Sequence, residues 1–250
     1  MAERYIPYCG TPPVPGGVTW NLDPILFAVL IALLVPLLWV AETRRDRILA
    51  LSGWAVVVAA LMSPLCNLSM ALFSARVGQH VLMSLVAAPL IAVAMGSPGA
   101  LRRRLHRALP HFETFGAPVA FAVMLWLWHM PGGYDATLRS DLVYWTMHVT
   151  MFFSSLWFWR LLLNEDSLSP GGAFVTSLVT GFQMCILGAV LALNSKALFV
   201  VHLTTTQAWG LSPLQDQQLG GMIMWVPAGI LVTGYAILSF GLAMKRAESE

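Results

Sequence analysis

The sequence predicts an all-α membrane protein, a bundle of seven transmembrane helices with its N-terminus outside and its C-terminus inside. Of the 250 residues, 58% are hydrophobic and 10% are charged, whereas soluble globular proteins have about 45–50% apolar and about 25% charged residues. The mean hydropathy of +0.72 agrees with this difference. Composition and the small net charge of +2 therefore exclude a cytosolic enzyme, a disordered chain and a nucleic-acid-binding protein.

Seven stretches of the chain are long and apolar enough to cross a membrane, which takes about 20 residues in a helix, within a range of about 17–25. Pro36 in the first stretch and Pro118 in the fourth are acceptable because neighbouring helices can satisfy the freed backbone groups. No long polar insertion separates the stretches, so we expect one bundle over residues 25–244 in contact with membrane lipids. A polar tail rich in Pro and Gly, residues 1–24, precedes it, and residues 245–250 follow it. The seven stretches are 25–41, 48–65, 77–95, 115–131, 142–163, 173–193 and 219–243.

The placement of Lys and Arg predicts the orientation, because short cytoplasmic loops carry an excess of both residues. With the N-terminus outside, ten of the 14 Lys and Arg lie on the inner side and four on the outer side. We therefore expect a multi-pass protein of a bacterial cytoplasmic membrane, with the tail of residues 1–24 outside. The inner residues are Arg44, Arg45, Arg47, Arg102, Arg103, Arg104, Arg107, Arg160, Lys245 and Arg246, and the outer ones are Arg4, Arg76, Arg139 and Lys196.

Four of the six histidines converge on the outer side of this arrangement. His80 lies near the outer end of the third stretch, His129 lies at the outer end of the fourth, and His148 lies about two turns into the fifth. His202 belongs to the outer segment between the sixth and seventh stretches. Ionisable side chains within a membrane are costly and mark functional sites, so these imidazoles are candidate metal ligands. The alternative is a set of interfacial histidines bonded to carbonyls or lipid headgroups.

Sulfur ligands are available on the same side. Met83 and Met151 each follow a histidine by three residues and share its helix face, Met130 directly follows another, and Cys66 lies at the end of the second stretch. Thioether, thiolate and imidazole ligands together select Cu(I) over hard ions. Methionines at helical spacing also fill protein cores, which is the competing interpretation. Cys9 and Cys66 both fall on the outer side, so they form either a disulfide or a soft-metal pair.

The segment 215–227 is the most distinctive part of the chain. Asp216 and three glutamines precede a Gly-Gly pair that allows close helix packing, and Trp225 is placed to anchor the helix at the membrane interface. Asp216 has two compatible roles: it can orient an imidazole that binds metal, or it can cap the start of the seventh helix.

Other classes of membrane protein are less well supported. The seventh stretch contains no lysine for a retinal Schiff base, and the seven stretches contain no carboxylate for an ion-coupled transporter. Heme b held between His80 and His148 on separate helices is an alternative. A copper-permeation protein that uses the same residues as a relay toward the inner side is another.

Three blocks of the sequence resemble the CtaG family of cytochrome c oxidase assembly proteins, the multi-span type found in bacteria. The first block comprises Ser63-Pro64-Leu65, Phe73-Ser74-Ala75, Gln79-His80, Ala88-Pro89-Leu90 and Gly96-Ser97-Pro98. The second comprises His129-Met130-Pro131, Tyr134-Asp135, His148 and Leu156-Trp157-Phe158-Trp159. The third, which is the most specific, comprises Asp216-Gln217, Gly220-Gly221 and Met224-Trp225.

The resemblance implies a membrane factor that matures a heme–copper terminal oxidase by handling Cu(I) at the outer face, with the oxidase subunits as its partners. Such a role needs no bond-forming chemistry on an organic substrate, so we do not expect an enzyme. The implied ligands are His80, His129 and His148, with Met83, Met130, Met151 or Cys66 as soft partners. The residues expected to support them are Asp216, Gln217, Met224, Trp225 and His202.

The sequence departs from the family's pattern at a few positions. Arg76 stands four residues before His80, where family members often carry another histidine. Tyr144 and Met147 stand shortly before His148, where the family tends to have a histidine and a glutamate. These departures define the main alternative, a divergent accessory or structural subunit of a respiratory membrane complex that binds no metal.

Overall fold

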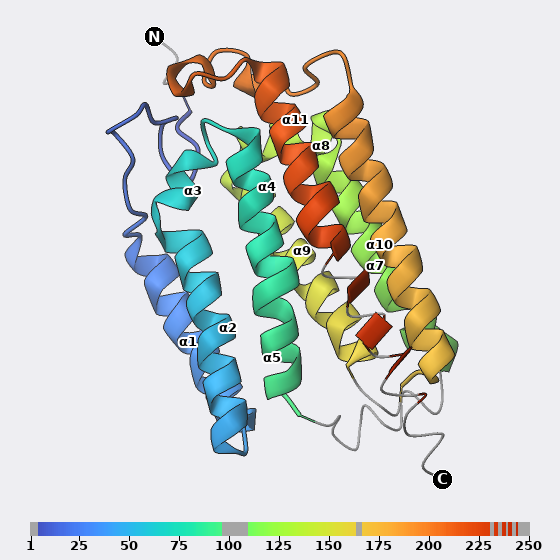
Figure 1. Cartoon of the computed structure of the whole chain (residues 1–250). Coiled ribbons are helices and arrows are strands. Elements are labelled where there is room, and N and C mark those ends of the chain that lie inside the picture. Colours follow the sequence, from blue (N-terminus) through green and yellow to red (C-terminus); the bar gives the residue numbers. More distant parts are fainter. Residues whose placement is uncertain are drawn as a thin grey trace.

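The computed structural model describes residues 5–96, 110–163 and 167–230, and a few residues between 233 and 244. Within these residues the chain is helical and has no strand, as the sequence predicts. Successive long helices run in alternating directions in one bundle, and short helices and loops cover the end that carries the N-terminus (Figure 1). The long helices are α1 (Pro24–Val40), α2 (Arg44–Met62), α4 (Phe73–Val81) with α5 (Ala88–Ala94), α7 (Pro110–His129), α9 (Asp141–Leu162), α10 (Pro170–Leu193) and α11 (Pro213–Ile223). The short elements are α3 (Pro64–Leu68), α8 (Pro131–Thr137), the 3-10 turns η2 (Val200–His202) and η3 (Gln207–Trp209), and the π-helical turns η1 (Leu82–Ala87) and η4 (Met224–Ala228).

Short polar side chains begin several of the helices. The carboxylate of Asp23 accepts the backbone N–H of Ile25 at the start of α1, at 2.8 Å. α2 and α11 begin with capping boxes, formed by Thr43 with Asp46 and by Ser212 with Gln215. Such caps satisfy backbone N–H groups that have no partner inside the helix, so these helix starts are encoded locally in the sequence.

Two helices of the described chain are long and apolar enough to cross a membrane, Phe73–Ala94 and Gly171–Leu193. A third span is added if the bent pair Thr114–His129 and Pro131–Thr137, whose axes differ by 75°, counts as one. By length and composition, the part of the chain that is described therefore has two or three candidate spans. The prediction of seven is wrong in number.

The other predicted stretches form helices that are short or that contain polar turns. α1 has 17 residues, α2 begins with the charged run Arg44–Arg47, and α9 has Asp141 in its first turn and Arg160 in its last. The last predicted stretch, 219–243, begins inside α11 and extends beyond the continuously described residues. The basic residues of 97–109 and 245–250, which entered the orientation argument, lie outside the described part, so the orientation stays a prediction.

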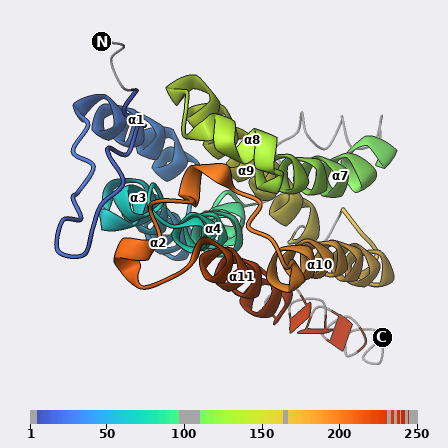
Figure 2. The ribbon, with the colours of Figure 1, turned by 90° about the horizontal axis from the view of Figure 1, so that it is seen from above.

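Glycines allow α11 to lie at close range between α4 and α10 (Figure 2). A Cβ on Gly220 would be 2.5 Å from Cδ1 of Phe73 in α4. A Cβ on Gly221 would be 2.6 Å from the backbone nitrogen of Ala192 in α10. Since real Cβ atoms essentially never make such short contacts, a larger residue at either position would push these helices apart.

Each π-helical turn is associated with a proline. Pro89 follows η1, and Pro227 lies inside η4. Because proline has no N–H to donate, the carbonyl one turn before it has no hydrogen-bond partner in a regular α-helix. A wider π-helical turn accommodates this break. In η1 the carbonyl of Ser84 accepts hydrogen bonds from Ser155 Oγ (2.7 Å) and Trp159 Nε1 (2.8 Å), both on α9. The irregular turn therefore holds α9 against the helix that carries His80.

Candidate functional site

Three histidines from three helices meet in the interior of the bundle. His80 lies on α4, His129 ends α7, and His148 lies on α9. The ring centroid of His80 is 5.4 Å from that of His129 and 5.6 Å from that of His148. All three side chains are at most 4% exposed. The structure thus brings together the three histidines that the sequence analysis selected, and we call them the histidine cluster.

Hydrogen bonds define the tautomers of two of these imidazoles. Nδ1 of His129 lies 2.7 Å from the carbonyl oxygen of Leu125, and Nδ1 of His148 lies 3.1 Å from that of Tyr144. A carbonyl oxygen can only accept, so each Nδ1 carries a hydrogen and donates it. In the neutral rings the Nε2 atoms then present a lone pair, and they have no hydrogen-bond partner in the described structure. Histidines that bind metals are commonly oriented by such a bond from the other nitrogen.

A small cavity of about 10 Å³ adjoins His80 and His129. Three buried methionines, Met151 on α9, Met184 on α10 and Met224 in η4, also line it. Because about 10–15 Å³ is the space that one water molecule needs, the cavity has room for a single small ion or water. We call it the thioether cavity. Its lining is completed by Val77, Val81, Ser84, Leu85, Phe121 and Leu125, and none of its described lining residues is a carboxylate.

The spacing of the imidazoles suits a shared ion, although the cluster is not closed around one. With a metal–nitrogen distance of about 2.0–2.1 Å, the centres of two imidazoles in a trigonal site lie about 5.5 Å apart, and the measured distances are 5.4 and 5.6 Å. Among the described residues, no group of three or more His, Cys, Asp or Glu is arranged to hold a metal ion as it stands. The rings must therefore turn to bind one. His80 is the least constrained, because neither of its nitrogens has a hydrogen-bond partner.

A buried arginine lies next to the histidine cluster. Arg76 is on α4, one turn before His80, and is 0% exposed. Its guanidinium carbon lies 5.1 Å from the ring centroid of Tyr144, and its Nη2 lies 3.9 Å from the sulfur of Met70. Its Nε and Nη1 atoms have no hydrogen-bond partner among the described residues. The sequence analysis counted Arg76 as an outer charge and missed this position, although the four-residue spacing to His80 places both on one helix face.

A family model for the cytochrome c oxidase caa3 assembly factor (Caa3_CtaG) matches residues 41–246, which include the histidine cluster and the thioether cavity. The chain belongs to the cytochrome c oxidase caa3 assembly factor family. The resemblance seen in the three sequence blocks is thereby confirmed. Membership of the family links the chain to the assembly of cytochrome c oxidase and to association with that enzyme. Comparison with curated proteins and with solved structures gave no match.

The Asp-Gln pair in the third block of this family member joins α11 to two neighbouring segments. The buried carboxylate of Asp216 accepts the backbone N–H groups of Phe73 (2.6 Å) and Ser74 (3.2 Å), and also the hydroxyl of Ser74. Gln217 donates to the carbonyl of Leu191 at the end of α10 (3.2 Å) and accepts the N–H of Leu198 (2.7 Å). Asp216 therefore caps α4 and positions the helix that carries His80. The sequence analysis considered a cap on the seventh helix itself.

His202 is held by hydrogen bonds on both ring nitrogens. The hydroxyl of Thr205 donates to the carbonyl of Ala71 (2.7 Å), so it accepts from Nδ1 of His202 (3.2 Å). Nε2 of His202 then accepts the hydroxyl hydrogen of Tyr134 at 2.7 Å. Burial, and the nearby charge of Arg76, lower the pKa of His202 to about 3. His202 thus connects Tyr134 to the loop above α4 and has no free nitrogen for a metal. Its role in supporting the metal ligands stays a prediction.

The predicted sulfur partners are dispersed. Met151 lines the thioether cavity, whereas Met83 lines a separate apolar groove of about 410 Å³ and Met130 is about half exposed. The predicted supporting residue Met224 also lines the cavity, and Trp225 is partly exposed. The cavity includes Met184, which the sequence analysis did not select because no histidine lies within one turn of it.

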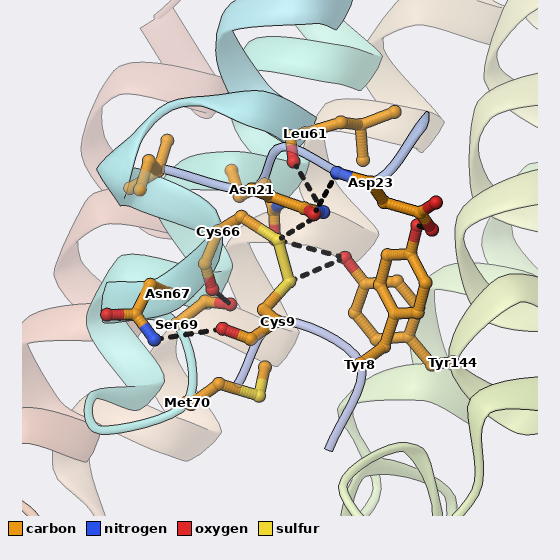
Figure 3. Close-up of a disulfide and its surroundings, with 12 residues drawn as sticks. Tyr8, Cys9, Asn21, Asp23, Leu61, Cys66, Asn67, Ser69, Met70 and Tyr144 are labelled. Carbon is orange, nitrogen blue, oxygen red and sulfur yellow. Dashed lines mark hydrogen bonds between the residues drawn. A yellow bond between two sulfur atoms is a disulfide. The ribbon is translucent and has the colours of Figure 1, made fainter. Parts of the chain in front are cut away.

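Cys66 forms a disulfide with Cys9, with a Cα–Cα distance of 5.6 Å (Figure 3). Of the two possibilities that the sequence left open, the structure therefore shows the disulfide. In this state Cys66 has no thiolate and is not a metal ligand, contrary to its place among the predicted soft partners. The hydroxyl of Tyr144 lies 3.2 Å from the sulfur of Cys9 and 3.6 Å from that of Cys66. The disulfide joins the N-terminal tail to α3 above the histidine cluster.

Proposed function

We propose that this assembly factor binds one Cu(I) ion between the histidine cluster and the thioether cavity and delivers it to cytochrome c oxidase. The family supplies the link to the oxidase. The copper is cargo and is not a resident cofactor, and no catalytic step is involved. The observation that carries the proposal is a set of buried imidazole nitrogens without hydrogen-bond partners beside a cavity lined by three thioethers.

Unpaired buried polar atoms support a ligand at this position. Nearly all buried polar groups in folded proteins have a hydrogen-bond partner, because leaving one unpaired costs about 1–3 kcal/mol. The Nε2 atoms of His129 and His148 and both nitrogens of His80 lack one in the described structure. Each neutral ring offers one lone pair, and the second nitrogen of His80 carries a hydrogen. An ion that accepts the three lone pairs would remove the penalty at three atoms at once. Imidazoles that only fill the core would have a lower free energy if their nitrogens were bonded to one another or to the backbone.

The donor set and the local charge favour Cu(I) over other ions. Imidazole and thioether are neutral, soft donors, which suit Cu(I), whereas Mg²⁺, Ca²⁺ and Mn²⁺ prefer carboxylate, carbonyl and water oxygens. The described lining of the cavity contains no carboxylate to balance a divalent ion. Arg76 already places a positive charge nearby, so a second charge of +1 is less unfavourable than one of +2. The same repulsion weakens binding, which suits an ion that must be passed on.

The His80 ring provides a means of releasing the ion. Asp216 fixes the start of α4, but the His80 ring itself has no hydrogen bond that restrains it. Rotation of this ring would exchange one ligand without moving a helix. We further propose that the cluster faces the outer side of a bacterial cytoplasmic membrane, because the Lys and Arg distribution favours an outer position for the N-terminal tail that lies above it.

Binding of Cu(I) to the oxidised, detergent-purified protein tests the proposal. We expect one ion per chain in an anaerobic competition titration with a chromophoric Cu(I) chelator, and loss of that ion in His148→Ala. Met130→Leu is the matched control, because Met130 is about half exposed and does not line the cavity. A wild-type protein that takes up no copper would overturn the proposal.

A metal-free accessory subunit is the second candidate. It is favoured by the absence, among the described residues, of a group already arranged to hold a metal ion, and by the charge of Arg76 beside the cluster. In that case the protein would co-purify with respiratory-chain subunits and contain neither copper nor pigment. Heme b is less well supported, because no described cavity is lined by both His80 and His148: the cavity beside His80 is about 10 Å³, and His148 lines the separate groove of about 410 Å³.

A further inference from the structure

We infer that Cys9 and Cys66, with Met70, form a second Cu(I) site when their disulfide is reduced, and that this site loads the histidine cluster. The disulfide is thus a redox control on this second site. The loading step rests on the function proposed above, since it supplies the ion that the histidine cluster binds. The second site itself stands on a separate group of residues.

Three sulfur atoms gather at the end of the bundle near the N-terminal tail. Cys66 lies in α3, and Met70 lies four residues later in the segment that connects α3 to α4. The disulfide brings Cys9 to Cys66. Cys66 and Met70 are 0% exposed and Cys9 is 6% exposed. Figure 3 shows Met70 among the residues that surround the disulfide. Two thiolates and a thioether are a donor set that favours Cu(I).

This sulfur group is one aromatic ring away from the histidine cluster. The hydroxyl of Tyr144 lies within 3.2 and 3.6 Å of the two cysteine sulfurs. The ring of Tyr144 packs on that of His148, with 4.3 Å between centroids. Tyr144 thus contacts both groups and lies between them. A change of its rotamer would connect the sulfur group to the cluster.

Arg76 provides the charge that a thiolate site needs. Its Nη2 lies 3.9 Å from the sulfur of Met70, its guanidinium lies over the Tyr144 ring, and two of its nitrogens have no hydrogen-bond partner in the described structure. A buried guanidinium without an anion is unfavourable. Cu(I) bound by two thiolates carries a net charge of −1, which would pair with Arg76. This gives a role to a charge that the histidine cluster alone does not use.

The redox step balances with an external dithiol as reductant. The dithiol transfers two electrons and two protons to the Cys9–Cys66 disulfide, giving two thiols, and is itself oxidised to a disulfide. Cu(I) then displaces the two thiol protons, which leave to solvent, and forms two copper–sulfur bonds. When the ion passes to the histidine cluster, the two copper–sulfur bonds break, copper–nitrogen bonds form, and the two thiolates take up two protons from solvent. The copper stays Cu(I) throughout. Access to Cys9 requires the tail to lift. Its anchors include the bonds that Asn67 Nδ2 donates to the carbonyls of Cys9 (2.8 Å) and Thr11 (3.1 Å).

The test compares copper stoichiometry in the two redox states of the full-length protein. One sample stays oxidised, and the other is reduced with dithiothreitol that is then removed under anaerobic conditions. Thiol counting after denaturation should give one thiol, from Cys185, in the first and three in the second. We expect one Cu(I) per oxidised chain and two per reduced chain, with added copper–sulfur scattering in the X-ray absorption spectrum of the second.

Variants separate the new site from the histidine cluster. The double variant Cys9→Ser, Cys66→Ser should bind one Cu(I) under both conditions. Because the double variant also releases the tail, Met70→Leu provides an independent check that keeps the disulfide. It should weaken Cu(I) binding at the additional site about 10-fold or more, which is the range seen when groups around a metal are changed. Cys185→Ser, in α10, is the matched control and should still bind two ions when reduced.

The outcomes distinguish the two proposals. One ion in both states, bound by the histidine cluster, would overturn the sulfur site and leave the proposed function standing. No ion when oxidised and one when reduced, with that ion lost in Cys9→Ser, Cys66→Ser and kept in His148→Ala, would support the sulfur site and overturn the histidine site. No ion in either state would overturn both.

Discussion

Replacement of Asp216 tests whether α11 holds α4, and with it His80, in position. The Asp216 carboxylate is 0% exposed and accepts the backbone N–H groups of Phe73 at 2.6 Å and Ser74 at 3.2 Å. In Asp216→Ala both buried donors lose their partner, at about 1–3 kcal/mol each, and the N-terminus of α4 loses a negative charge worth about 0.3–1 kcal/mol. We therefore expect the free energy of unfolding to fall by about 2–7 kcal/mol.

Unfolding of the detergent-solubilised protein, followed by tryptophan fluorescence, measures this loss. Asp216→Asn keeps one acceptor oxygen and should lose roughly half as much. Asp46→Ala is the control, because Asp46 belongs to an exposed capping box on α2 and should cost less than the buried contact. If Asp216→Ala were no more destabilised than Asp46→Ala, the assignment of Asp216 as the anchor of α4 would be refuted.

Three further substitutions test other parts of the structure. Burial and the charge of Arg76 lower the pKa of His202 to about 3 from an ordinary value of 6.5. As the pH drops below about 6.5, His202 is therefore protonated in the unfolded chain before it is protonated in the folded protein, and stability falls. By pH 5 the free energy of unfolding is lower by about 2 kcal/mol. His202→Gln should remove that part of the loss, as measured by unfolding at pH 7 and pH 5. Gly220→Ala should destabilise by about 1–3 kcal/mol because its Cβ would meet the Phe73 ring at 2.5 Å, whereas Gly78→Ala, with nothing within 4 Å, should be neutral or stabilising in the same assay. Met184→Leu should change the free energy of unfolding by less than about 1.5 kcal/mol. It should weaken Cu(I) binding about 10-fold or more in a chelator competition. An unchanged affinity would show that Met184 is not a ligand.

Convergence of the histidines could be predicted from sequence because it depends on where apolar stretches end. In the predicted order of stretches, His80, His129 and His148 each lie toward the outer end of their helix, that is, toward the same side of the membrane. Alternating helices of similar length bring such positions together regardless of detailed packing. The structure places the His80 ring 5.4 Å from that of His129 and 5.6 Å from that of His148, between centroids. The helical content could also be predicted, because it depends on composition and on local capping signals.

Features that depend on how helices pack could not be predicted from spacing alone. Met184 joins the thioether cavity because α10 packs beside α7 and α11, and no histidine near it in sequence marks it as a ligand. Because Arg76 is charged and precedes an apolar stretch, the sequence predicts that it lies outside the bundle. Its position on α4 instead places its side chain in the interior. Asp216 looks like a local cap, but its partner helix is 142 residues away in sequence. The number of spans was overestimated because the predicted stretches include helices that are short, such as α1 with 17 residues, or that contain polar and aromatic side chains among the apolar ones, such as α9.

The copper-edge X-ray absorption spectrum of the oxidised protein, loaded with one equivalent of Cu(I), tests the central claim most directly. With Cys9 and Cys66 in a disulfide, copper in this sample has no thiolate from that pair. The account predicts a Cu(I) shell that contains both imidazole nitrogen and thioether sulfur, with the imidazole contribution reduced in His80→Ala. A protein that retains no copper, or a shell of oxygen ligands alone that His80→Ala leaves unchanged, would contradict it.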